Sequence, residues 1–240
     1  MSSDGARTRL PLFPLPDLVH FPRTDLKLLV SEARHRRLVR DVLERAEQAE
    51  RAEREDEDEQ HIGIVLLRPD GGEDAEGRPA VFPGGTAARV VDVEHLPDGR
   101  SSIHLHGEFR FELERELAPE PYRQALVRPI DEPRLNERDA GIVAVRRDIL
   151  TSALSLAGDS NGGFPLAAED LERLGERGVF EELVNGIAAG LDLPTLRKLQ
   201  LLAESLPERA LSLLSILKSR RQVLDLLRPF RHLAAKSDSN

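Results

Sequence analysis

Two histidines, His104 and His106, stand two positions apart in the segment "SSIHLHGEFRFELEREL". Residues two apart on a β-strand project from the same face of the sheet, so both imidazoles would point to the same side. Such a pair can bind zinc when a third ligand joins it, and Glu108, His95 and Asp92 are the nearby candidates. With an open coordination position for water, that site would be the centre of a metal-dependent hydrolase.

The alternative interpretation is that His104 and His106 are half-exposed strand histidines without a ligand. Their surroundings lack the distinctive ligand spacing of known zinc motifs. The sequence therefore predicts no metal site and no cofactor, and the two histidines remain weak metal candidates only.

Four arginines, Arg34, Arg36, Arg37 and Arg40, gather near the start of a helical segment, with Arg23 shortly before it. Guanidinium groups in a cluster can bind phosphate or an acidic peptide. Binding of RNA or of a small ligand through Arg34–Arg40 is therefore the alternative function for this chain. Against RNA, aromatic side chains for base stacking are few, and ordinary ion pairs along the helix explain part of the cluster.

Composition narrows the function classes further. The 240 residues carry a net charge of −9, which argues against a broad nucleic-acid surface, and nucleic acid is an unlikely partner. There is no cysteine, so disulfides and thiolate metal sites are excluded. Neither a signal peptide nor an apolar run of about 18 residues occurs, so we expect a cytoplasmic protein with no membrane partner.

The first half of the chain has the pattern of β-strands. The opening stretch "RLPLFP" is apolar and contains two prolines, which confine a strand to a sheet edge or to strand starts. One helix, starting at Ser31 and marked by an apolar stripe at Leu38 and Val42, interrupts the strands. The expected strands cover residues 9–14, 25–30, 61–69, 85–96, 101–117 and 122–130.

From about Asn136 the pattern changes to helices, and the last helix is long, from about Pro207 to Arg228. A β-rich half followed by helices predicts an α+β fold with a helical second module. We expect a β module at residues 8–131, a helical subdomain at 137–231, and flexible tails at 1–7 and 232–240. Self-association through the last helix is a further hypothesis.

The segment "LPLFPLPDLVHFP" resembles the start of the Lon protease N-terminal domain, and further segments resemble that family in the same order. These include "GIVLL", "GTAARVVDVEHLPDGR", "GEFRFEL" and "YRQALV", and the helical half resembles the helical subdomain that follows in Lon. The resemblance implies a PUA-like mixed β-barrel/sheet module with one interrupting helix, followed by an all-α bundle ending in a long helix. The residues of the family signature, expected to be structural, are Pro11, Pro14, Pro22, Glu32, Gly63, Gly85, Gly107, Arg110, Phe111 and Tyr122. One departure is that Arg23 follows Pro22 where the family often has glycine.

The family resemblance also implies a function. It indicates a non-enzymatic module that binds unfolded or degron-bearing polypeptides, in the manner of an adaptor in protein quality control that serves a protease or chaperone. The residues expected to contact such polypeptides are Phe13, Leu15, Phe21, Arg34 and Arg36. The sequence contains neither a Gly-x-x-x-x-Gly-Lys-Ser/Thr loop nor a Gly-x-Ser-x-Gly motif, so we expect a free-standing domain without ATPase or peptidase activity.

Overall fold

A computed structural model describes residues 7–51, 60–73, 78–118, 121–158 and 164–227. These residues form six strands and six helices, which divide into two compact units. The first unit comprises the chain up to Glu132 together with Thr195–Ala203, and the second comprises Pro133–Pro194 together with the chain from Glu204 onwards. The domain boundaries expected from the sequence stay a prediction, and the expected tails lie outside the described residues except for Arg7.

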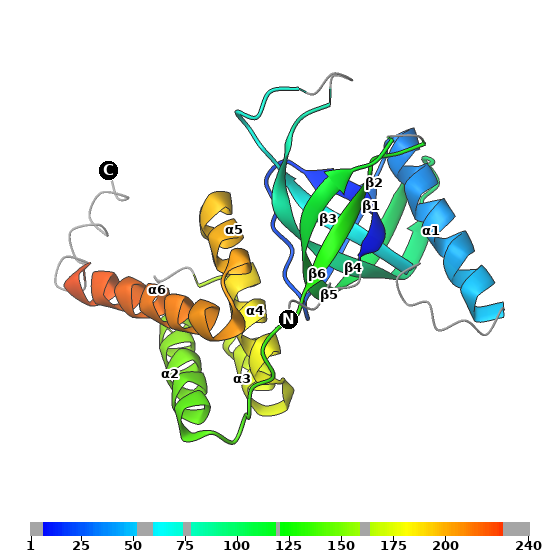
Figure 1. The fold of residues 1–240 in the computed structure, drawn as a ribbon. Coiled ribbons are helices and arrows are strands. Elements are labelled where there is room, and N and C mark those ends of the chain that lie inside the picture. Colours follow the sequence, from blue (N-terminus) through cyan, green and yellow to red (C-terminus); the bar gives the residue numbers. More distant parts are fainter. Residues whose placement is uncertain (1–6, 52–59, 74–77, 119–120, 159–163, 228–240) are drawn as a thin grey trace, which may run out of the picture. The chain divides into compact units, whose positions relative to one another are not determined.

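The first unit contains the whole sheet and the helix α1 (Ala33–Arg51) (Figure 1). The strands are ordered β2-β5-β4-β3-β1-β6. Their bounds are Thr8–Leu15 for β1, Asp25–Val30 for β2, His61–Leu67 for β3, Val81–His95 for β4, Ser101–Glu116 for β5 and Gln124–Ile130 for β6. A mixed sheet with one inserted helix, followed by a helical region, confirms the α+β prediction.

The sheet closes on itself through its longest strand. β5 pairs antiparallel with β4 along most of its length, and its later residues, from Arg110 to Glu116, also pair with β6. The strands β5, β4, β3, β1 and β6 therefore form a closed ring, to which β2 is attached by pairing with the first half of β5.

The expectation that the prolines of the first strand confine it to a sheet edge or stand at strand starts is wrong, because Pro11 and Pro14 lie within β1 (Thr8–Leu15). β1 lies between β3 and β6 in the ring. The register shows how prolines are accommodated there. Residues Thr8–Pro11 pair antiparallel with β6, whereas Leu12–Leu15 pair parallel with β3. Each half of β1 therefore forms backbone hydrogen bonds with only one neighbouring strand. A proline, which has no N–H to donate, can then stand where its nitrogen faces the side without a partner strand.

Two apolar clusters lie on the two sides of the strands. One draws on all five strands of the ring and consists of Leu10, Leu12, Val65, Ala87, Phe111, Ala125 and Val127. The other packs between the strands and α1 and includes Phe13, Ile64 and Leu105 from the strands with Leu38 and Val42 from the helix. Neighbouring strand residues go to opposite clusters, as the pleat requires.

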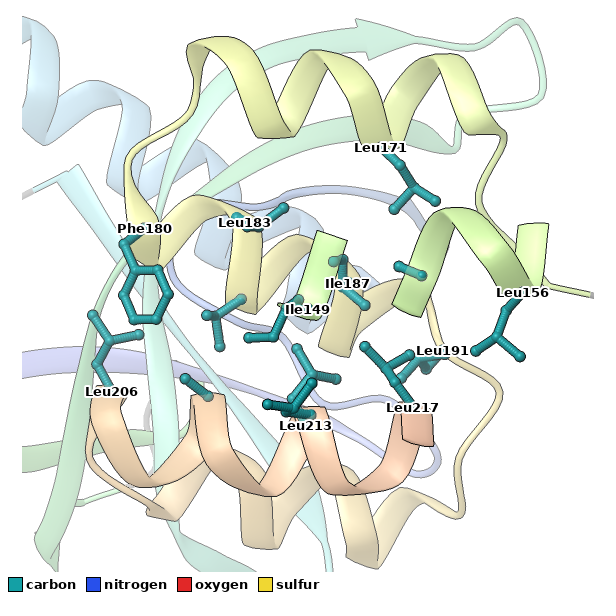
Figure 2. Close-up of a cluster of buried hydrophobic side chains, with 14 residues drawn as sticks. Ile149, Leu156, Leu171, Phe180, Leu183, Ile187, Leu191, Leu206, Leu213 and Leu217 are labelled. Carbon is teal, nitrogen blue, oxygen red and sulfur yellow. The ribbon is translucent and has the colours of Figure 1, made fainter. Parts of the chain in front are cut away.

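The second unit is a helical bundle. It contains α2 (Ala140–Ala157), α3 (Ala168–Arg177), α4 (Phe180–Gly190) and the long α6 (Leu206–Leu227). Figure 2 shows side chains of these helices, among them Ile149, Leu171, Ile187 and Leu213, gathered into one buried cluster. The remaining helix, α5 (Thr195–Ala203), groups by its contacts with the strands of the first unit.

Among the described helices, none combines the length and apolarity that crossing a membrane requires.

Candidate functional site

One of the larger hollows on the first unit is a groove at the end of β1, which we call the proline groove. Its volume is about 420 Å³. Segments far apart in the sequence supply its walls, and several of them contribute proline. Its lining residues are Leu12, Pro14, Pro16, Glu32, Arg34, His35, Leu67, Arg78, Pro79, Pro121, Tyr122 and Arg123.

Hydrogen bonds hold one wall of the proline groove in place. Arg123 donates two hydrogen bonds to the carboxylate of Glu116, at 2.6 and 2.7 Å, and a third to the backbone oxygen of Pro79 at 2.8 Å. Arg45 on α1 donates to the Tyr122 hydroxyl at 2.9 Å. Burial of Tyr122 raises the pKa of its phenol, so the ring stays neutral at physiological pH.

The opposite wall is formed at the start of α1. His35 stacks on Phe13 with ring centroids 4.3 Å apart. Burial lowers the pKa of His35, which favours the neutral imidazole as an apolar surface. Arg34 is paired with Glu32 at 2.7 Å, so both charges lie at an exposed rim.

The chemistry of this groove suits the binding of apolar side chains. Proline lacks a backbone N–H, so a wall rich in proline offers apolar carbon and few donors to a bound chain. Three arginines against two glutamates border this surface once Glu116 is counted with the lining residues. Such a groove can bury apolar side chains and accept an acidic group at its rim.

The five residues expected to bind polypeptide fall into different places. Phe13 and Phe21 are core residues, 5% and 0% exposed, and Phe13 supports the groove from beneath through His35. Arg34 lines the proline groove. Leu15 is half-buried and stands between Pro14 and Pro16, which both line the groove. Arg36 points elsewhere and donates to the backbone oxygen of Gly99 at 2.6 Å.

The two strand histidines face an aspartate on the neighbouring strand. Nδ1 of His106 lies 2.7 Å from Asp25 Oδ1, and Nε2 of His104 lies 3.8 Å from the same oxygen. The residue that contacts both histidines is thus Asp25, and not Glu108, His95 or Asp92, which the sequence analysis considered as third ligands. Within the described ranges, no group of three or more His, Asp or Glu side chains is arranged to hold a metal ion.

A second polar cluster lies across β3, β4 and β5. Glu108 contacts His61 Nε2 at 2.5 Å and accepts a hydrogen bond from Arg89 at 2.8 Å. Burial raises the pKa of Glu108, but the hydrogen bonds from His61 and Arg89 outweigh burial and hold that pKa below its usual value. Glu108 is therefore an ionised partner of these two side chains.

The arginine and phenylalanine of the family signature lie at the junction of β5 and α5. Phe111 is fully buried within the ring. Arg110 is almost fully buried, donates to the backbone oxygens of Leu202 and Ala203 at 2.8 and 3.2 Å, and pairs with Glu132 at 2.6 Å. Because Arg110 places its charge at the carboxyl end of α5, it satisfies carbonyl groups that lack partners within that helix.

The signature glycines Gly63 and Gly107 lie where a side chain or a second backbone segment approaches the glycine closely. At Gly63 an added Cβ would come within 2.9 Å of Leu12, and at Gly107 it would overlap the backbone oxygen of Phe21. Gly107 also exchanges backbone hydrogen bonds with the turn that contains Arg23. Arg23 itself adopts a left-handed conformation with φ of 60°, which glycine adopts without strain.

The proline groove contains residues that sequence reasoning did not select, among them Pro16, Leu67, Pro79, Pro121 and Arg123. They come together because β1 lies beside both β3 and β6, which brings segments that are far apart in the sequence to one place. The one local signal was the recurrence of proline next to strand ends.

Known proteins resemble this chain over most of its length. It is 26% identical to the Lon protease of Flavobacterium johnsoniae over 227 residues, which is 94% of this chain and 26% of that protein. It is 27% identical to the Lon protease of Anaeromyxobacter dehalogenans over 90% of this chain and 24% of that protein. The chain therefore spans about a quarter of the length of these relatives.

Solved structures share the fold. The N-terminal domain of a Mycobacterium avium complex Lon protease superposes with a TM-score of 0.61 at 16% identity, over 88% of this chain and 98% of that one. A Lon N-terminal domain protein from Xanthomonas campestris gives a TM-score of 0.51 at 22% identity, over 87% and 98%.

The family model for the substrate-binding domain of the ATP-dependent protease La (Lon) matches residues 9–219. This match covers both the strands around the proline groove and the helices that follow them. The chain belongs to the family of Lon substrate-binding domains.

Proposed function

We propose that this protein binds unfolded or degron-bearing polypeptides and that the proline groove is where it binds them. The groove supports this proposal because it is the hollow where apolar surface, prolines and Tyr122 come together. Apolar side chains of a client would lie against the groove, and the bordering arginines would face its acidic residues. Membership of a substrate-binding family supports polypeptide as the ligand class.

The role that follows is that of a non-enzymatic recognition factor in protein quality control, which delivers bound clients to a protease or chaperone. The groove supplies contact surface and charge, with no pairing of nucleophile and base among its lining residues. We propose that this role is carried out in the cytoplasm.

The experiment is a titration of the purified protein against a fluorescent, permanently unfolded polypeptide, with a folded protein and an RNA oligomer in parallel. We expect saturable binding to the unfolded chain that tolerates salt, because apolar burial is not screened by ions. Salt-sensitive capture of RNA with no binding to the polypeptide would instead favour the arginines of α1 as a nucleic-acid site.

A pair of variants tests the groove itself. Pro16→Lys places a charged side chain in the groove at an exposed position, and we expect the Kd for the polypeptide to rise roughly tenfold. Pro69→Lys makes the same change at an exposed proline that does not line the groove, and it should leave the Kd unchanged. Equal affinities of the two variants would remove the proline groove as the binding site.

A further inference from the structure

A second groove runs along α1, on the face of the helix that points toward the β4–β5 hairpin. Its volume is about 520 Å³. The helix contributes one face, which we call the seam and which consists of Arg36, Val39, Arg40, Leu43, Glu44 and Glu47. Residues three and four apart share one face of a helix, and such a face can pack against a second helix.

The charges along this seam have opposite signs at its two ends. Arg36 and Arg40 lie toward the start of α1, and Glu44 and Glu47 follow one to three turns later. With a rise of 1.5 Å per residue, the seam from Arg36 to Glu47 is about 16 Å long. The floor between the charged ends is apolar, and Val39 and Val93 are part of it.

The two central charges are available to a partner. Arg40 and Glu44 are exposed and stand four residues apart on α1, yet within the described part of the chain neither makes an ion pair. By contrast, Arg37 on the same helix lies 3.9 Å from Asp41. The seam therefore presents one cation and one anion side by side.

We propose that this seam is a self-association surface and that its occupant is α1 of a second copy of the chain, packed antiparallel. A two-fold axis through the middle of the seam sets Arg36 opposite Glu47 of the second copy and Arg40 opposite its Glu44. The same contacts then recur with the copies exchanged, as an isologous interface requires. A seam that is basic at one end and acidic at the other matches its own copy when that copy is reversed, and it repels a parallel copy.

The first measurement is the mass of the full chain by sedimentation equilibrium, over roughly 1 to 200 µM. We expect the mass to rise from 26.7 kDa toward twice that value, and to do so at lower protein concentration in low salt. A mass that stays at 26.7 kDa up to the highest concentration would overturn the proposal.

Charge reversal decides whether α1 is the surface. Arg40→Glu sets two glutamates against each other across the axis, and Glu44→Arg sets two arginines against each other. Each should raise the dimer Kd about tenfold or more. The double variant R40E/E44R restores opposite charges, and its Kd should return to within about threefold of the original value.

A matched control separates this effect from net charge. Arg173→Glu makes the same change in charge at an exposed position on α3, and it should leave the dimer Kd unchanged. A dimer that ignores both single reversals, or a double variant as weak as the singles, would exclude the α1 seam. Circular dichroism of each variant confirms that the fold is retained.

Discussion

His20 is a histidine enclosed by the turn between β1 and β2. Its side chain is buried, and Nδ1 lies 3.4 Å from the hydroxyl oxygen of Thr24. Thr24 donates its only hydroxyl proton to the backbone oxygen of Phe21 at 2.7 Å. The contact with His20 therefore requires the proton on Nδ1, and Nε2 is left without a hydrogen-bond partner in the described structure.

This environment resists a positive charge. Burial is the main cause that lowers the pKa of His20 to about 4, the nearby His106 lowers it further, and Asp25 acts in the opposite direction. The unfolded chain, with a histidine pKa near 6.5, binds the proton more readily than the folded chain does. The folded state therefore loses stability as pH falls below about 6.5, and the loss from this group is complete near pH 4.

We predict that His20→Gln reduces the pH dependence of the free energy of unfolding. Between pH 6.5 and pH 4 the free energy of unfolding of the original protein should fall by on the order of 3 kcal/mol more than that of the variant, because glutamine does not titrate. Urea unfolding at several pH values measures it. Parallel curves for the two proteins would show that His20 is protonated as easily in the folded chain as in the unfolded one.

At the scale of elements, the close approach of β3 and of the Phe111 side chain from β5 to β4 depends on a glycine, Gly85. A Cβ on Gly85 would lie 2.5 Å from the backbone oxygen of Ile64 and 2.7 Å from the Phe111 ring. The neighbouring Gly84 has no atom within 4 Å of the same position. The two glycines of "PGGT" thus differ completely in the space around them.

We predict that Gly85→Ala destabilises the protein by about 2 to 3 kcal/mol, because either the β3–β4 pairing or the Phe111 ring must shift. Gly84→Ala, one residue away on the same strand, should change the free energy of unfolding by less than about 0.5 kcal/mol. Chemical denaturation of the two variants measures both values. Similar losses in both would indicate that strand propensity, and not the close approach, sets the cost.

At the scale of the whole molecule, the first unit is assembled from two stretches of chain that lie far apart in the sequence. The helix α5 follows β6 by more than sixty residues, yet Arg110 of β5 binds its last carbonyl groups. Glu132, where the first stretch ends, pairs with the same guanidinium. One buried arginine therefore joins β5, α5 and the end of the strand region.

We predict that Arg110→Gln loosens α5. Hydrogen exchange at residues 198–203 should become faster, and stability should fall by about 3 kcal/mol because Glu132 loses its buried partner. Arg128→Gln removes an arginine from an exposed pair with Glu112 and should leave exchange in α5 unchanged. Exchange that stays slow after Arg110→Gln would mean that apolar contacts alone hold the helix.

Features specified by residues close together in the sequence could be predicted, whereas features that depend on contacts between distant segments could not. The strand expected at residues 101–117 and the helix marked by the stripe of Leu38 and Val42 are both present, as β5 and α1, because signals within a few residues of one another specify such elements. The position of β1 was predicted wrongly, because a proline is compatible with an edge and also with a strand that changes partners midway. The proline groove could not be assembled from sequence, since its walls meet only after the ring has closed.

The divided pairing of β1 also bears on how the chain is synthesised. β1 precedes the other described strands in the sequence and therefore leaves the ribosome before them, but its partner strand β6 begins at Gln124. At about 5 to 20 residues per second, Leu10 and Leu12 wait on the order of ten seconds before the ring can enclose them. Pro11 and Pro14 interrupt this apolar stretch throughout that time, and a segment interrupted by proline is a poor template for pairing between nascent chains.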